Sequence, residues 1–141
     1  MTTTRRRRAL AVAVAIVVLL AGCMSGDQSR LHNELNADRR AHGRAALPTH
    51  DALNSKAQKW ADRLAWIGKL EHSHLPSGVP SCWRGLAENV AYASSVPAAQ
   101  DALMRSSGHR ANILGSWDHV GVGATWRGNT VFVVQFFMRG C

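Results

Sequence analysis

The chain has 141 residues, with 17 Lys and Arg against nine Asp and Glu and a formal net charge of +8. Four of the basic residues form the run Arg5–Arg8, so residues 23–141 keep only 13 basic against nine acidic residues. So mild an excess, without another basic run or interleaved aromatic side chains, argues against a nucleic-acid-binding protein. A solvated surface with some attraction to anionic envelope polymers is the plainer interpretation.

The first 22 residues have the features of an export signal. The basic run precedes the wholly apolar segment Ala9–Ala21, which is well short of the roughly 20 residues that a spanning helix needs. We therefore expect residues 1–22 to be a signal peptide and the chain to be exported. The remaining 119 residues suit one domain with a single core.

The signal ends in Leu20-Ala21-Gly22-Cys23, which resembles the lipobox of bacterial lipoproteins. The resemblance implies that Cys23 is acylated and becomes the new N-terminus, with residues 23–28 as a short tether and residues 29–141 as the domain. Acyl chains would hold the domain at the outer face of the bacterial cell membrane. The alternative is an ordinary secreted protein cut after a small residue.

With Cys23 acylated, two cysteines remain, Cys82 and Cys141. In an oxidising compartment they are expected to form one disulfide. Two free thiols at a metal site are the alternative, although neither cysteine lies in a CxxC pair.

Hydrophobic periodicity predicts helices over residues 29–41, 50–67 and 97–105, and one or two helical turns over 108–114. Residues 71–84, with two prolines, a glycine and three serines, predict a long loop. Residues 85–93 are expected to form a short helix or turn.

The last part of the chain has the period of a β-hairpin, with strands over residues 119–126 and 130–137 and a glycine in the connection. The second strand is apolar on both faces, so both faces should be covered. We therefore expect an α/β fold, a three-layer α/β/α sandwich around a small antiparallel sheet.

Four of the seven histidines lie in predicted loops or at the ends of elements, where functional residues concentrate: His72, His74, His109 and His119. Glu88 lies in an apolar stretch, where a carboxylate is costly unless it is paired. An imidazole or a metal would pair with it; alternatively, it caps a short helix or accepts from a backbone amide.

Four successive segments, "LEHSHL", "GLAENVAYA", "SGHRANIL" and "DHVGVGATW", resemble the signature blocks of the CAP superfamily, in the family's order. This superfamily includes cysteine-rich secretory proteins, insect venom allergens, plant pathogenesis-related proteins and many bacterial exported proteins; the match is nearest to the bacterial branch. The resemblance implies an α/β/α sandwich of CAP (SCP) type with a central cleft. Many members carry there two histidines and two glutamates that can hold a divalent metal, often zinc.

Carried over residue by residue, the resemblance implies that His72, Glu88 and His109 belong to the cleft. The second glutamate precedes the "GH" pair in eukaryotic members, and Leu103–Ser107 has no carboxylate there. Two histidines and one glutamate still form a recognised zinc ligand set. A hydrogen-bonded polar triad without metal is the alternative.

Three accessory residues complete the predicted site. His74 is expected at the cleft rim, His119 at the cleft or the neighbouring loop, and Asn89 in a hydrogen bond to loop backbone. The favoured function is a binding module for a lipid, another small ligand or an envelope protein, since no serine lies in a nucleophile elbow. The alternatives are a metal-dependent hydrolase of envelope substrates, with His119 as the candidate base, and a purely structural envelope protein.

Overall fold

A computed structural model of the chain describes residues 23–141; the predicted signal peptide, residues 1–22, lies outside the described residues. Three antiparallel strands form one sheet in the order β1-β3-β2, namely β1 (Trp83–Ala93), β2 (His119–Arg127) and β3 (Thr130–Gly140). The central strand β3 is buried from Val131 to Met138. This continuous burial confirms that both faces of the predicted second strand are covered.

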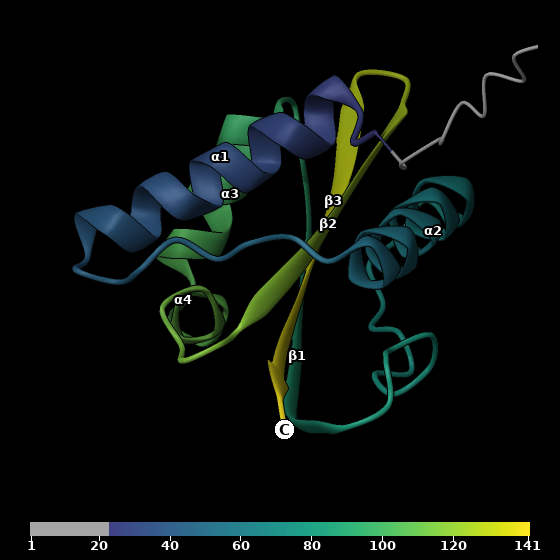
Figure 1. The fold of residues 1–141 in the computed structure, drawn as a ribbon. Coiled ribbons are helices and arrows are strands. Elements are labelled where there is room, and N and C mark those ends of the chain that lie inside the picture. Colours follow the sequence, from purple (N-terminus) through teal and green to yellow (C-terminus); the bar gives the residue numbers. More distant parts are fainter. Residues whose placement is uncertain (1–22) are drawn as a thin grey trace, which may run out of the picture.

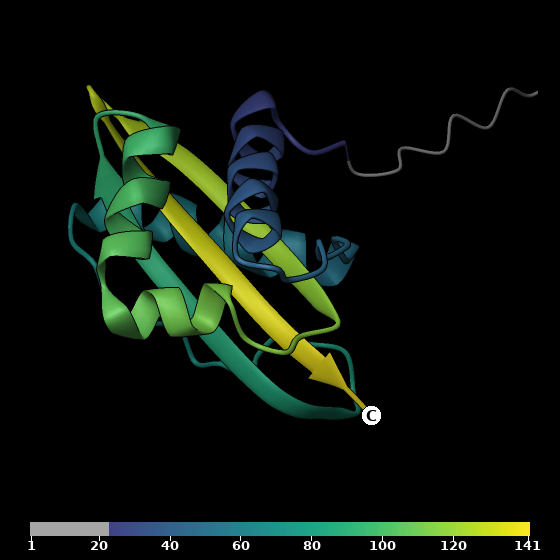
Figure 2. The same ribbon diagram turned by 90° about the vertical axis from the view of Figure 1, so that its left-hand side faces the viewer.

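The helices cover the two faces of the sheet unequally. Figures 1 and 2 show α2 (Asp51–Ile67) on one face, and α1 (Gly26–Ala41), α3 (Val96–Arg105) and α4 (Ser107–Ile113) on the other. Alternate residues of β3 serve the two layers, because successive strand side chains point to opposite faces. Phe132, Val134 and Phe136 pack with α2. Val131, Val133 and Phe137 point the other way and pack with the helices of the opposite layer. The three-layer α/β/α fold is therefore confirmed.

The helix boundaries follow from local capping. Helix α1 begins at Gly26, three residues earlier than the periodicity predicts, because Ser25 and Gln28 form a capping box. The Gln28 side chain also donates to the Val122 carbonyl at 2.8 Å, so most of the expected tether is part of the folded domain. Helix α2 ends at Gly68 with a φ of 72°, which glycine adopts readily. None of the helices within residues 23–141 is long and apolar enough to cross a membrane.

The expectation of a short helix or turn over residues 85–93 is wrong. This segment is the edge strand β1, paired antiparallel with β3 from Trp83 to Ala93. Its alanines weaken the alternation of a strand, and each of its paired residues on β3 lies at least 38 positions further along the chain, the smallest separation being from Ala93 to Val131. A pairing that distant leaves no signal in a local window of sequence.

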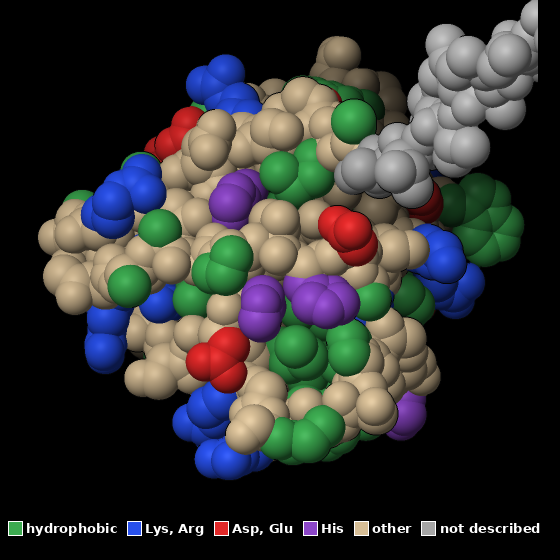
Figure 3. Space-filling view, in the orientation of Figure 1, with side chains coloured by type: hydrophobic (Ala, Val, Ile, Leu, Met, Phe, Trp, Pro, Cys, Tyr) green, Lys and Arg blue, Asp and Glu red, His purple; other side chains and the backbone are tan. Residues whose placement is uncertain are grey.

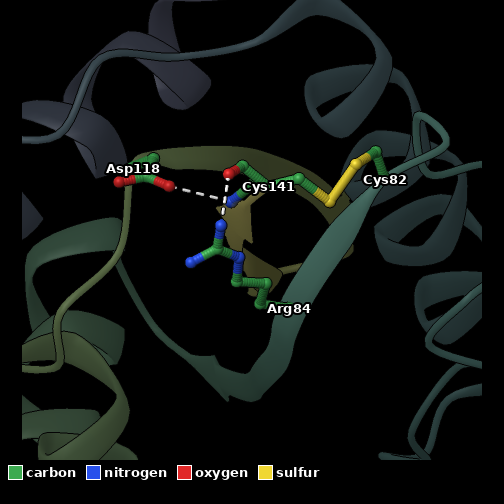
Figure 4. The surroundings of a disulfide bond; sticks show 5 residues. Cys82, Arg84, Asp118 and Cys141 are labelled. Atoms are coloured by element: carbon green, nitrogen blue, oxygen red, sulfur yellow. Dashed lines mark hydrogen bonds between the residues drawn. A yellow bond between two sulfur atoms is a disulfide. The ribbon is translucent and has the colours of Figure 1, made fainter.

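The predicted disulfide is present between Cys82 and Cys141, 59 residues apart in the chain. It joins the residue before β1 to the residue after β3 (Figure 4). Two hydrogen bonds support the same corner: Arg84 Nη2 donates to the Cys141 carbonyl at 2.7 Å, and the Gly140 amide donates to Asp118 Oδ2 at 2.8 Å. The C-terminus is thereby tied to the start of the edge strand.

Candidate functional site

Glu88 is the centre of the polar site. Its side chain is 1% exposed, and its carboxylate oxygens accept from the Ser73 amide at 2.8 Å and the Ser73 hydroxyl at 2.5 Å. His72 Nδ1 lies 2.9 Å from Glu88 Oε1. Hydrogen bonds of this charge-assisted kind are the strong ones in proteins. Glu88 therefore anchors the loop between α2 and β1 to the sheet.

The edge strand β1 places neighbouring residues on opposite sides of the sheet. Glu88 points toward the α2 side, whereas the next residue, Asn89, points toward α4 and is fully buried. Asn89 Nδ2 donates to the His109 carbonyl at 3.0 Å, and Asn89 Oδ1 accepts from Asn112 Nδ2 at 2.9 Å. The expected bond of Asn89 to loop backbone is thus made to the backbone of helix α4.

Buried amides continue this contact into the core. Asn89 Nδ2 also donates to Gln135 Oε1, Gln135 Nε2 to Gln100 Oε1, and Gln100 Nε2 to Asp38 Oδ2, at 3.1, 2.5 and 2.7 Å. The buried side-chain amides of Asn89, Gln135 and Gln100 thus all have hydrogen-bond partners, as stability requires. The position of α4 is therefore fixed through β1, β3, α3 and α1.

His109 lies in α4, in a partly buried position. The pKa of His109 is lowered from its ordinary value of 6.5. Burial is the larger cause of this shift, and the nearby His72 is the smaller one. The His109 imidazole is therefore neutral at neutral pH. Arg39, itself 3% exposed, holds the end of α4 by donating from Nη1 to the Ile113 and Gly115 carbonyls at 2.6 and 2.9 Å.

A groove adjoins the Glu88 cluster, between one face of α2 and the loop that follows it. It has a volume of about 490 Å³ and is lined by Ala52, Ser55, Lys56, Lys59, Trp60, Ser73, His74, Ser77 and Gly78. Lys56 Nζ bridges the two walls by donating to the His74 and Ser77 carbonyls at 2.9 and 2.7 Å. Burial lowers the pKa of Lys56, and the charge of Glu88 partly opposes this shift.

The accessory histidines have different surroundings. His74 lies on the groove, with Nδ1 2.8 Å from Ser77 Oγ. His119 packs edge-on against His50, with ring centroids 5.6 Å apart, and its Nδ1 has no hydrogen-bond partner among residues 23–141. Figure 3 shows histidine side chains beside a hydrophobic patch near the middle of one face, while Lys and Arg are spread over it.

The contacts of the predicted triad do not have the form of a zinc site. Glu88 accepts three hydrogen bonds, and residues 23–141 contain no group of three or more His, Cys, Asp or Glu side chains placed to hold a metal ion. This arrangement is that of a hydrogen-bonded cluster and does not form a three-ligand site. Zinc binding by His72, Glu88 and His109 stays a prediction.

Replacing the central carboxylate tests its anchoring role. We expect Glu88→Gln to lower the free energy of unfolding by about 2 kcal/mol, because an amide group cannot accept at both positions and loses the charge. Cleavage by proteases within residues 71–82 should increase. Glu34→Gln is the matched control, since Glu34 makes only an exposed pair with Arg30 at 3.7 Å, worth little. Equal losses in the two variants would contradict the anchoring role.

Two residues that shape the site were missed from the sequence. Ser73 donates twice to Glu88, and Lys56 joins α2 to the loop. The only available signal for Ser73 was its place beside His72. Lys56 resembles any exposed helical lysine in sequence, because its partners become neighbours only after the loop folds back.

With this geometry established, comparison with known proteins identifies the family. The model of the CAP domain, described as the cysteine-rich secretory protein family, matches residues 32–137. The chain belongs to the CAP family. The match includes His72, Glu88, Asn89 and His109, and every helix and strand lies wholly or largely within it.

Solved structures share the CAP fold at low sequence identity. An outer surface protein from Borrelia burgdorferi has a TM-score of 0.70 and 17% identity, over 82% of this chain and 93% of that one. An extracellular SCP-domain protein from Bacillus anthracis has a TM-score of 0.69 and 23% identity over 81% of this chain. A venom allergen-like protein from Schistosoma mansoni has a TM-score of 0.61 and 15% identity, over 84% and 91% of the two chains.

The CAP domain is part of a longer chain in one of these proteins, since the present chain spans 40% of the Bacillus anthracis protein. No curated protein matches the chain in sequence. The similarity to these solved structures, all below 25% identity, establishes the fold alone.

Proposed function

We propose that this CAP protein is exported, anchored by acyl chains on Cys23 to the outer face of a bacterial membrane, and binds an amphiphilic ligand, a lipid with an acidic head group. The lipobox-like sequence and the printed descriptions of two similar structures, an outer surface protein and an extracellular protein, support export. Cys23 is exposed and not part of the disulfide, as acylation requires.

The groove beside α2 is the observation that carries the ligand proposal. Its volume of about 490 Å³ lies within the range of small-molecule sites, roughly 300–1,000 Å³. Ala52, Lys56 and Trp60 follow one another at helical spacing and offer a methyl group, a methylene stem and an indole. These surfaces suit an acyl chain.

The basic residues of the groove indicate the charge of the ligand. The Lys56 ammonium already donates hydrogen bonds to two loop carbonyls, those of His74 and Ser77. Lys59 is exposed and makes no hydrogen bond or ion pair with the described side chains and backbone. A carboxylate or phosphate head group would pair with Lys59 at the edge of the groove.

No contact among residues 23–141 favours a hydrolase. His119, the candidate base of the metal-dependent alternative, packs against His50, and its Nδ1 has no hydrogen-bond partner among the described residues. Ser73 and His72 both bond to Glu88, so the histidine does not activate the serine as a base. The same contacts are compatible with a binding role. Glu88 holds Ser73 of the loop that forms one wall of the groove, so the Glu88 contacts support the shape of the groove.

The test is a titration with a fluorescent polyene fatty acid. We expect saturable binding to the unmodified protein and a loss of at least tenfold in affinity for Ala52→Trp, whose indole fills the groove. Lys59→Gln should weaken binding about fivefold, the effect of about 1 kcal/mol from one exposed charged contact. Arg40→Gln, an exposed cation on α1, is the control and should bind as the unmodified protein does.

Two results would contradict the proposal. Absence of saturable binding by the unmodified protein would exclude this class of ligand. Unchanged binding by Ala52→Trp, with the fold confirmed by circular dichroism, would place the ligand outside the groove.

A further inference from the structure

Large apolar side chains are exposed mainly at one end of the domain. Among residues 23–141 the exposed ones are Trp66, Tyr92, Trp126, Trp83 and Leu70, at 79, 56, 44, 42 and 39% exposure. Single exposed hydrophobic residues are ordinary on protein surfaces, whereas a cluster indicates an interaction surface.

Contacts place the segments that carry four of these five side chains at the hairpin end of the sheet. Trp126 Nε1 donates to Asp27 Oδ2 at 2.9 Å, in the first turn of α1, which begins three residues after Cys23. Arg127, the next residue, has Nη1 3.4 Å from the carbonyl of Ala65, which precedes Trp66. The hairpin turn thus lies between the start of the domain and the end of α2.

The edge strand brings the remaining two side chains to the same end. Tyr92 packs against Phe132 with ring centroids 5.6 Å apart and lines a hollow with Gly68 and Arg127. A neighbouring hollow is lined by Tyr92 and Leu70. We call the end of the domain that carries Trp66, Leu70, Tyr92 and Trp126 the anchor end. Cys23 precedes α1 and lines a separate hollow with the first half of α2.

Trp83 lies at the opposite end of the molecule. It follows Cys82, whose disulfide holds the C-terminus. In Figure 1 the C-terminus and the turn between β2 and β3 lie at opposite ends of the sheet. Trp83 and Trp126, with 42 and 44% exposure, therefore form a matched pair for experiments.

The charges at this end are of both signs. Glu71 lies 3.3 Å from Arg63 and 3.4 Å from Lys69, and Arg30 pairs with Glu34. Charge therefore contributes little net attraction to an anionic surface. Tryptophan and tyrosine, by contrast, favour the boundary between lipid head groups and acyl chains, where a ring and a polar tip are both accommodated.

We infer that the anchor end is a membrane-contacting surface, whose exposed aromatic side chains enter the head-group layer beside the acylated Cys23. This inference rests on the proposed acylation. It fixes the orientation of the domain, since the end with the disulfide and Trp83 then points away from the bilayer.

The test uses the acylated protein purified from bacterial membranes and reconstituted into phosphatidylcholine vesicles with bromine near the top of the acyl chains. Bromine quenches only nearby tryptophans. We expect quenching in the acylated protein of natural sequence. When Trp66 and Trp126 are both replaced by phenylalanine, the quenched fraction of the fluorescence should be at least twofold smaller. Trp83→Phe should keep the quenched intensity, and 1 M salt should not abolish the quenching.

Opposite results would overturn the inference. Quenching that persists in the double variant and is lost in Trp83→Phe would reverse the orientation, and absence of quenching would exclude membrane contact. Mass spectrometry of Cys23 separates these outcomes from failure of the anchor itself: an acylated protein without quenching overturns the orientation alone. A chain without acyl groups overturns the anchor and the orientation that depends on it.

Discussion

Replacing Cys82 and Cys141 together by serine is expected to lower the free energy of unfolding by about 4 kcal/mol, the chain-entropy value for a loop of this length. The bond closes 59 residues and joins the start of the edge strand to the end of the central strand. An unfolded chain freed of this constraint gains many conformations. Urea unfolding followed by tryptophan fluorescence measures the change.

Reduction of the unmodified protein provides the control for the disulfide. A reducing agent should produce a similar loss in the unmodified protein and no further loss in the double serine variant. If the free energy of unfolding of the double serine variant falls by less than about 1 kcal/mol, the disulfide does not stabilise the fold as argued, because such a loss lies well under the usual range for native disulfides.

Gly121→Ala is expected to lower the free energy of unfolding by about 3 kcal/mol, at the upper end of ordinary overpacking costs. A Cβ atom at Gly121 would lie 2.2 Å from the Leu53 carbonyl carbon, in the backbone of α2. The helix would have to move away from β2 and open the core between them. Thermal and urea unfolding measure the loss, and a change under 0.5 kcal/mol would contradict such close packing.

Gly108→Ala is the matched control for this substitution. Gly108 lies in α4, and a Cβ atom there would meet nothing within 4 Å. Alanine at such a position restricts the unfolded chain and favours helix, so a gain of about 0.5 kcal/mol is expected. The same chemical change should thus have opposite signs at the two glycines.

The elements predicted well from the sequence are those whose signals are local. The hairpin of β2 and β3 has alternation, β-branched residues and a glycine turn within one stretch, and helix α2 has a broad apolar face ended by Gly68. Hydrophobic periodicity predicts the start of α1 at residue 29, three residues after its true start at Gly26. The capping hydrogen bonds of Ser25 and Gln28 fix this start, and hydrophobic periodicity does not detect them. Strand β1 was missed because its only partner is distant β3.

The candidate site was predictable in its residues and not in its arrangement. The signature blocks pointed to His72, Glu88 and His109, but the opposite directions of Glu88 and Asn89 follow only once β1 is known to be a strand. The groove depends on the path of residues 68–82 over α2. That path is set by contacts such as Lys56 to the Ser77 carbonyl, which no local pattern encodes.

The most direct measurement for lipid binding in the groove is photo-cross-linking with a fatty acid that carries a diazirine on its chain, followed by peptide mass spectrometry. We expect label on α2 between Ala52 and Trp60 and on the loop between Ser73 and Gly78, with the label lost in Ala52→Trp. Label confined to other segments, or labelling unaffected by Ala52→Trp, would contradict a ligand site between α2 and this loop.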